Sequence, residues 1–446
     1  GHMVHEYYVQ TERELTRRRA EARSQVKTRA QLRRLQAELR RKIRRCFARL
    51  PRRRTPLNAR ITGLLERREY TVEKVIYESR PNLPVTANLY IPRGISSPRP
   101  AVLGTCGHTM DGKAYHLYQS FAAGLARQGY VVLVYDPLGQ GERSQFTARD
   151  GRHRPVGCTR EHNMMGNQMT LLGDYFGCWR AWDGIRSLDY LLSRPEVDRT
   201  RVGVTGNSGG GTMTTFLSAL DERFTMAAPS CFVTTYLHNF ENEEPQDAEQ
   251  CPPGFLAAGM EMADFFIARI PRPLLLLGQE KDFFDDRGLR AVYEELRRLY
   301  AIAGAPQNVQ LFIGPREHGY FRENREAMYR FFNKHAGVRA SGREPRNLRL
   351  EPIPDLWATP RGQVLRLKGN RRVFEFTRES ADELSRRRRA PSARALLAAI
   401  QKRLSLPKRS APPHHRRIRL YWPAGDGYQA HTGFAVETEP GIQALI

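Results

Sequence analysis

The chain of 446 residues lacks several features that would assign a protein to a structural class at once. It has no run of eighteen or more apolar residues, so we expect no membrane-spanning helix and no membrane partner. Its six cysteines are dispersed, without a CxxC pair or zinc-ligand spacing, and we expect reduced thiols. No nucleic-acid-binding motif is present. What remains is a chain long enough for one large domain with appendages.

Acidic residues are scarce relative to basic ones, and the formal net charge is +25. Much of this charge is local, because residues 11–54 hold 16 Arg and 2 Lys against 4 Glu. A second basic run covers residues 342–419. Neither run interleaves aromatic residues as a single-strand binder would. We therefore expect a solvated Arg-rich surface and no nucleic-acid partner, with an acidic polysaccharide or a partner protein as the alternatives.

The basic N-terminal segment, residues 1–54, also carries an apolar stripe. Five apolar residues recur there at helical spacing: Leu32, Leu35, Leu39, Ile43 and Phe47. The stripe predicts one or two charged helices that end at Pro51 and pack against the body of the protein. Gly1-His2-Met3 looks like a tag remnant, so the sequence leaves the compartment open between cytoplasm and secretion.

The most informative motif is Gly206-Asn207-Ser208-Gly209-Gly210. It follows the apolar strand 201–205 and precedes a small-residue segment typical of a helix start. This is the G-x-S-x-G nucleophile elbow in its strand–turn–helix context. Glycines two residues either side of the serine allow a tight turn and close packing of helix on strand. The motif predicts that Ser208 is a nucleophile.

Candidate partners of Ser208 follow two later apolar runs. The run 273–278 leads to Asp282, and the run 309–314 leads to His318. Ligands bind past the carboxyl ends of strands in open α/β sheets. We predict that His318 is the general base and that Asp282 orients it. Asp285 and Asp286 remain alternatives as the acid, although aspartates here could equally cap a helix that begins near Arg287.

An oxyanion hole needs two backbone N–H groups aimed at the developing negative charge. One candidate is the amide of Gly209, directly after the nucleophile. The other is the amide of His108, in the loop that follows the apolar run 101–104. The His108 side chain could face the substrate or make ordinary hydrogen bonds.

Strands alternate with helices from about residue 70 to residue 336. Residues 130–136 read as a buried strand, and residues 182–192 carry apolar residues at helical spacing. This alternation predicts an α/β fold with a mainly parallel, doubly wound sheet.

Residues 55–340 resemble the acetyl-xylan-esterase-like branch of the α/β-hydrolase superfamily, which is related to prolyl-oligopeptidase-type hydrolases. The stretches that carry the resemblance are 107–109, 111–113, 136–143, 182–189, 206–211, 282–284 and 317–320. The resemblance implies a catalytic domain over 55–340 that hydrolyses esters through Ser208, His318 and Asp282, without a metal or organic cofactor. It favours removal of acetyl or other small acyl groups from carbohydrate. A serine peptidase and a non-catalytic scaffold with the same fold are the alternatives.

Two stretches are candidates for shaping specificity. The long polar insert between Arg143 and Tyr175 is expected to pack over the pocket mouth. The stretch 236–259 is locally acidic, with Glu241, Glu243, Glu244, Asp247 and Glu249. Its carboxylates lack a defined ligand spacing, so we expect a solvated loop and not a metal site.

The C-terminal residues 341–446 are predicted to form a small α+β extension. Residues 428–444 resemble residues 70–85, with Glu437–Ile442 matching Glu78–Leu83. The similarity predicts either the start of a truncated second hydrolase-like repeat or an ordinary β-appendage. The oligomeric state is left open.

Overall fold

The structure is a computed structural model that describes residues 2–146, 156–346, 348–404, 411–421 and 431–446. The chain divides into two compact units, one of residues 21–380 and one of residues 1–20 with 381–446. The larger unit holds the α/β fold that the sequence predicts.

The larger unit is built on one nine-stranded sheet with the strand order β1-β2-β3-β5-β4-β6-β7-β8-β9. Six strands, β4 to β9, pair with their neighbours in parallel. Strands β1, β2 and β3 pair antiparallel at one edge of the sheet, where β3 also pairs antiparallel with β5. The strands are β1 (Arg60–Glu66), β2 (Tyr70–Arg80), β3 (Leu83–Pro92), β4 (Arg99–Thr105), β5 (Val131–Tyr135), β6 (Val197–Asn207), β7 (Met226–Ser230), β8 (Leu274–Lys281) and β9 (Val309–Glu317).

Helices precede, connect and follow these strands. They are α1 (Met3–Ser24), α2 (Arg29–Cys46), α3 (His116–Arg127), α4 (Cys158–Leu171), α5 (Phe176–Ser193), α6 (Gly209–Leu220), α7 (Tyr236–Glu241), α8 (Met262–Ile267), α9 (Asp286–Ala303), α10 (Arg322–Ala336), α11 (Val373–Arg387) and α12 (Ala393–Leu404). Helix α4 lies in the long insert that the sequence analysis placed over the pocket mouth. Residues 147–155 of that insert lie outside the described residues.

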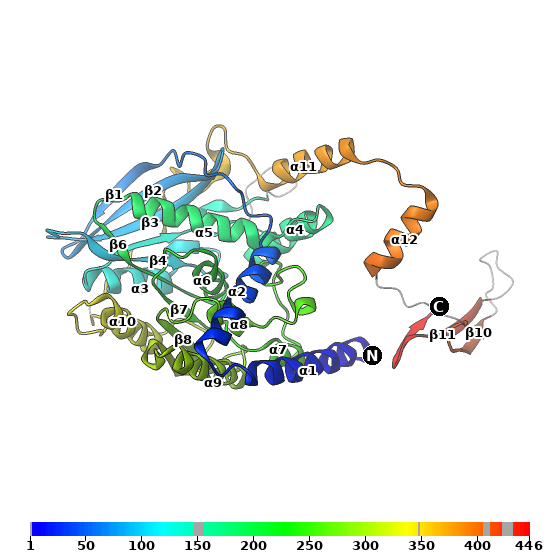
Figure 1. The fold of residues 1–446 in the computed structure, drawn as a ribbon. Helices are drawn as coiled ribbons and strands as arrows, with labels where there is room; N and C mark the ends of the chain where they lie inside the picture. The colour runs from blue at the N-terminus through cyan, green and yellow to red at the C-terminus, as the bar shows by residue number, and fades with distance from the viewer. Residues whose placement is uncertain (1, 147–155, 347, 405–410, 422–430) are drawn as a thin grey trace. The chain divides into compact units, whose positions relative to one another are not determined.

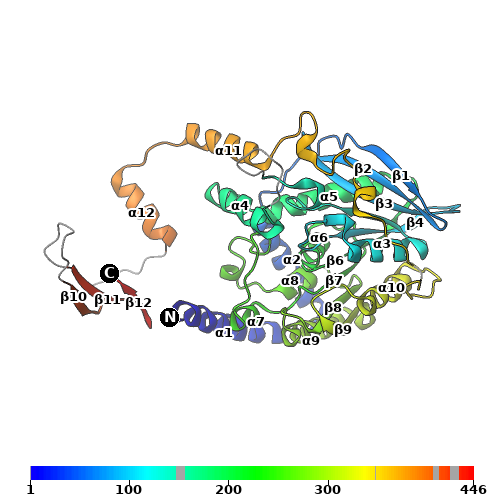
Figure 2. The same ribbon diagram turned by 180° about the vertical axis from the view of Figure 1, so that it is seen from behind.

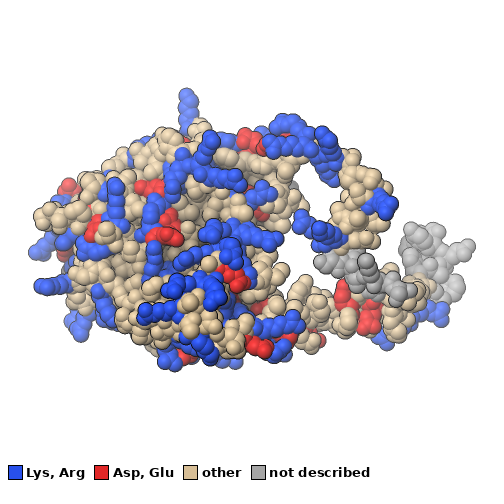
Figure 3. Space-filling view, viewed as in Figure 1, with Lys and Arg blue, Asp and Glu red and all other residues tan. Residues whose placement is uncertain are grey.

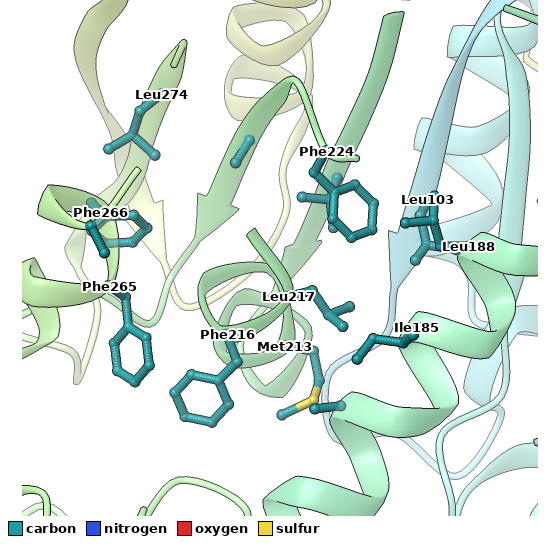
Figure 4. Close-up of a cluster of buried hydrophobic side chains, with 14 of the residues drawn as sticks. Leu103, Ile185, Leu188, Met213, Phe216, Leu217, Phe224, Phe265, Phe266 and Leu274 are labelled. Carbon is teal, nitrogen blue, oxygen red and sulfur yellow. The ribbon is translucent and has the colours of Figure 1, made fainter. Parts of the chain in front are cut away.

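Both faces of the sheet are covered, as expected for a doubly wound fold. Helices α2, α5, α6, α8 and α9 contribute to the apolar cluster on one face, and α3 and α10 to the cluster on the other (Figure 1, Figure 2). Side chains of β5 alternate between the two clusters. On the first face, residues from α5, α6 and α8 interdigitate with residues from β4 and β8 (Figure 4). This packing fixes the sheet whose carboxyl edge carries the candidate site.

The apolar stripe of the N-terminal segment packs against the sheet unit, which confirms that part of the sequence analysis. Leu32, Leu39, Ile43 and Phe47 are buried in the first core, and Leu35 is partly buried against it. Thr28 begins α2 with a capping box, since its hydroxyl accepts from the Gln31 amide.

The compact unit therefore extends beyond the predicted range 55–340 at both ends. Beyond residue 340, the backbone amides of Ala358 and Thr359 donate to the buried carboxylate of Glu142, and the Val373 amide donates to Gln145. Segments distant in sequence thus satisfy buried polar groups of the sheet unit, which local patterns do not reveal.

The C-terminal unit contains a three-stranded antiparallel sheet of β10 (His415–Tyr421), β11 (His431–Glu439) and β12 (Ile442–Leu445). The β11–β12 pairing shifts register between Glu437 and Glu439 and closes on the pair Glu439↔Ile442. The β2–β3 pairing shifts between Glu78 and Arg80 and closes on Arg80↔Leu83. These are the positions that the sequence similarity aligns, so the proposed repeat extends to the same bulge and turn. The repeat itself stays a prediction.

The remaining global features agree with the composition. All six cysteines are free thiols. Among the described residues, none of the helices combines the length and apolar character needed to cross a bilayer. Lys and Arg side chains are spread over the face drawn in Figure 3, with Asp and Glu between them.

Candidate active site

The elbow around Ser208 has the strained geometry that the motif predicts. Ser208 joins β6 to α6 with φ 60° and ψ −126°, a left-handed conformation that is costly for a residue other than glycine. A Cβ at Gly206 or Gly210 would lie 2.3 Å from the carbonyl oxygen of Thr105. Both glycines are therefore required for the close approach of β4 to the turn.

His318 and Asp282 follow two neighbouring parallel strands, β9 and β8. His318 Nδ1 lies 2.8 Å from Asp282 Oδ1, which also accepts from the Phe284 amide. The Asp282 side chain is 1% exposed, and the His318 side chain is 24% exposed. The imidazole ring stacks on Phe283 with a centroid distance of 4.2 Å. The ring is thus held by one carboxylate and one aromatic face.

The elbow and the histidine lie at the same edge of the sheet. The Ser208 amide donates to Ser230 at the end of β7. The thiol of the next residue, Cys231, donates a hydrogen bond to the carbonyl oxygen of Gly319. The ligand atoms of Cys231, Asp282 and His318 all lie within 4.8 Å of one another. The segments that follow the neighbouring strands β7, β8 and β9 therefore bring Cys231, Asp282 and His318 together, and the Ser208 turn is hydrogen-bonded to the end of β7.

Asp285, the alternative acid, has a different environment. It is the N-cap of α9 and accepts the Arg287 amide at 2.8 Å. Its carboxylate also binds the Arg287 guanidinium and the Asn242 side chain, and these hydrogen bonds hold its pKa well below the usual range. Asp286 pairs with Arg290 on the surface of α9. Among the described residues, His318 forms no hydrogen bond with Asp285 or Asp286.

The loop after β4 abuts the elbow, as the oxyanion prediction requires. A Cβ at Gly107 would lie 2.9 Å from Ser208 Cβ, and the Gly107 amide donates to the Tyr118 hydroxyl. The His108 ring packs on Gly209, since a Cβ there would lie 2.8 Å from His108 Cε1. The positions of His108 and Gly209 fit an oxyanion hole, and the role of their backbone amides stays a prediction.

Several residues that carry the family resemblance form a buried ionic network behind this loop. Lys113 Nζ lies 2.7 Å from Asp136 Oδ2 and also binds Glu142. Arg143 pairs with Asp183 at 2.7 Å. Buried charges are stable only when paired in this way. The network fixes the loop after β4 relative to β5 and α5.

The acidic stretch 236–259 is not uniformly solvated, which corrects the sequence-based expectation. Glu241 and Glu243 are exposed, but Asp247 and Glu249 are buried. They meet His108 and His162, a buried residue of α4. The expectation failed because His162 and Asp247 are 85 residues apart, and only the fold brings them together.

Burial and charge shift the proton affinities of this cluster in opposite directions. Burial opposes protonation of His108, yet the nearby carboxylates of Asp247 and Glu249 outweigh it and raise the His108 pKa to about 9. Burial lowers the pKa of His162, with Asp247 acting against it. Nearby on α4, burial raises the pKa of Glu161 to about 7.

Comparison with known proteins finds similarity to esterases and hydrolases. A family model described as acetyl xylan esterase (AXE1) matches residues 63–247. "Putative hydrolase YtaP" of Bacillus subtilis (strain 168) is 27% identical over 273 residues, which cover 57% of this chain and 85% of the relative.

Two solved structures share the fold. Methylesterase BT1017 superposes with a TM-score of 0.66 at 23% identity, covering 82% of this chain and 79% of its own. A "putative acetyl xylan esterase" from Bacteroides fragilis NCTC 9343 gives 0.52 at 18% identity, covering 65% of this chain and 76% of its own. Over residues 63–247 the chain is therefore similar to acetyl xylan esterases, and its larger unit shares the fold of these two solved structures.

Proposed function

We propose that the chain is a serine esterase that works through an acyl-enzyme, with Ser208 as nucleophile, His318 as general base and Asp282 as the orienting acid. The observation that carries this proposal is the 2.8 Å contact of His318 Nδ1 with Asp282 Oδ1, next to the strained Ser208 turn. The Asp282 contact leaves Nε2 as the ring nitrogen that can accept the serine proton.

In the proposed mechanism, Ser208 Oγ attacks the ester carbonyl while His318 removes its proton. The amides of Gly209 and His108 stabilise the oxyanion of the tetrahedral intermediate. Protonated His318 then gives its proton to the leaving alcohol, and the acyl group remains on Ser208. Water, activated by His318, attacks the acyl-enzyme and releases the acid.

For the substrate, we propose acetyl or other small acyl esters of carbohydrate. The matched family model is that of acetyl xylan esterases. One structural neighbour is a methylesterase, so a methyl ester of a sugar acid belongs in the test beside an acetylated sugar. The two substrates differ in which side of the ester carries the sugar.

The test is hydrolysis of p-nitrophenyl esters from acetate to octanoate, followed by acetylated xylan and a methyl-esterified sugar acid. Ser208→Ala and His318→Ala are each expected to remove most turnover while the circular dichroism spectrum stays unchanged, because the triad acts as a unit. Ser218→Ala, on the same helix α6, is the matched control and should keep wild-type rates. Equal rates for wild type and Ser208→Ala on every ester would reject the mechanism, and cleavage of a chromogenic proline amide alone would favour the peptidase.

A further inference from the structure

Outside the triad, one buried cluster of titratable side chains comes from three separate segments. His108 lies in the loop after β4, His162 on α4, and Asp247 and Glu249 in the loop after α7. One ligand atom from each lies within 4.8 Å of all the others. Their side chains are 16%, 0%, 5% and 0% exposed, in that order. The cluster is therefore inside the protein and not a solvated acidic patch.

The hydrogen-bond pattern of His162 leaves a lone pair facing a carboxylate. His162 Nε2 lies 2.9 Å from the carbonyl oxygen of Leu138, which can only accept, and 3.4 Å from Nη1 of Arg180. The contact with Leu138 is the shorter one and favours the proton on this nitrogen in the neutral ring. His162 Nδ1 then presents a lone pair to Asp247 Oδ2 at 2.8 Å. Two acceptors at this distance repel unless something positive lies between them.

His108 and Glu249 show the same pattern. His108 Nε2 is 2.8 Å from Asp247 Oδ2 and 3.3 Å from Glu249 Oε1, but it forms an aligned hydrogen bond with neither. Glu249 Oε1 is fully buried and accepts no hydrogen bond from the described residues. The other oxygen, Oε2, is in contact with the guanidinium of Arg180. Oε1 therefore points into the cluster without a hydrogen-bond donor.

Imidazole nitrogens and carboxylate oxygens are the ligands that Zn²⁺ and related divalent transition metals take in proteins. We propose that His108, His162, Asp247 and Glu249 form a binding site for a divalent transition metal, with Zn²⁺ as the first candidate. The site lies directly beside the elbow, since a Cβ at Gly209 would be 2.7 Å from Glu249 Oε1. Bound metal would cross-link the loop after β4, α4 and the loop after α7, and would stabilise the folded chain.

The test measures metal binding and not esterase activity. The full chain is stripped with EDTA, incubated with Zn²⁺, passed over a chelating resin and analysed for zinc by mass spectrometry. We expect about one Zn²⁺ retained per chain, in line with a single four-ligand site, and a melting temperature several degrees above that of the stripped protein. Asp247→Asn and His162→Gln are expected to lose both effects. Glu243→Gln, an exposed carboxylate in the same loop, is the matched control and should keep them.

The experiment also distinguishes the proposed site from two other groups of residues that could bind zinc. His414 and His415 are adjacent in sequence, so the wild-type measurement is repeated with His414→Gln/His415→Gln. The triad cluster contains the Cys231 thiol, whereas the proposed site has no sulfur. Co²⁺ in the proposed site should give visible d–d bands without the near-ultraviolet thiolate-to-metal band that Cys231 would produce.

The proposal is overturned if folded wild-type protein retains no Zn²⁺ or if its Co²⁺ spectrum shows the thiolate band. Zinc retained equally by folded Asp247→Asn and His162→Gln would also overturn it. The cobalt spectrum of the wild type decides the question even if both variants fail to fold. Absence of metal would assign the cluster to a protein-only ion network with a protonated imidazole between the carboxylates.

Discussion

Replacing Asp282 by Asn is the sharpest test of the proposed triad. Asn has the same size, but its side-chain NH₂ cannot accept the proton on His318 Nδ1. The ring is then driven to the tautomer with the proton on Nε2, where it cannot receive the serine proton. The Asp282 side chain is 1% exposed, so water has little access to take over its contact with the ring.

The expected loss in kcat is large. In serine proteases the same change costs about 10⁴-fold, which corresponds to about 5.5 kcal/mol of transition-state stabilisation. We expect a loss of this order for Asp282→Asn, with a small change in KM, because no substrate contact is removed. Steady-state kinetics on p-nitrophenyl acetate measures both constants.

Asp285→Asn is the matched control, three residues along the same loop. Asn caps helices as well as Asp does. The Arg287 side chain that pairs with Asp285 is 69% exposed, so water screens this ion pair and its loss changes the stability little. Its kcat should stay close to that of the wild type. A crippled Asp285→Asn beside a nearly active Asp282→Asn would refute the assignment of the acid.

Three further predictions address the fold and its pH dependence. Phe216→Ala empties a ring from the core shown in Figure 4 and should cost about 3–5 kcal/mol in urea unfolding; a cost below about 1 kcal/mol would show that the core collapses around the gap. Gly210→Ala places a methyl 2.3 Å from the Thr105 carbonyl oxygen and should abolish esterase activity, which wild-type turnover in this variant would contradict. Burial raises the pKa of Glu161 to about 7 from 4.5, so the folded state loses stability as pH rises from 4.5 to 7, and the loss is complete above 7. The free energy of unfolding of Glu161→Gln should therefore exceed that of the wild type by up to about 3 kcal/mol at pH 8, but not at pH 4.5. An equal difference at both pH values would contradict this prediction.

Patterns within a few residues of sequence predicted most of the central strands and the turn that carries Ser208. Continuous apolar runs identified β4, β5, β8 and β9, because strands buried on both faces have no polar side. The elbow was recognised because its glycines are needed within two residues of Ser208. Strand β7 (Met226–Ser230) was missed, since it is five residues long and contains Pro229, which argues against a central strand.

Contacts between distant segments explain what the sequence analysis did not find. The choice between Asp282 and Asp285 depends on which carboxylate contacts His318. Both aspartates follow the same apolar run, so the sequence pattern does not distinguish them. Asp247 and Glu249 looked like the rest of a solvated acidic loop, because their burial depends on α4. Histidine at position 162 within the insert was a weak hint, since nothing in the sequence pairs it with residues 85 positions later.

The packing of α2 limits how the chain can be shortened. The Phe47 ring, at the end of that helix, contacts Tyr175, Phe216 and Phe265 at centroid distances of 5.6, 5.2 and 6.4 Å. A fragment that starts at residue 63, where the family match begins, would expose these rings together, and such patches promote aggregation. The part of the chain that matches the family model is therefore smaller than the part that must be expressed to keep these aromatic rings covered.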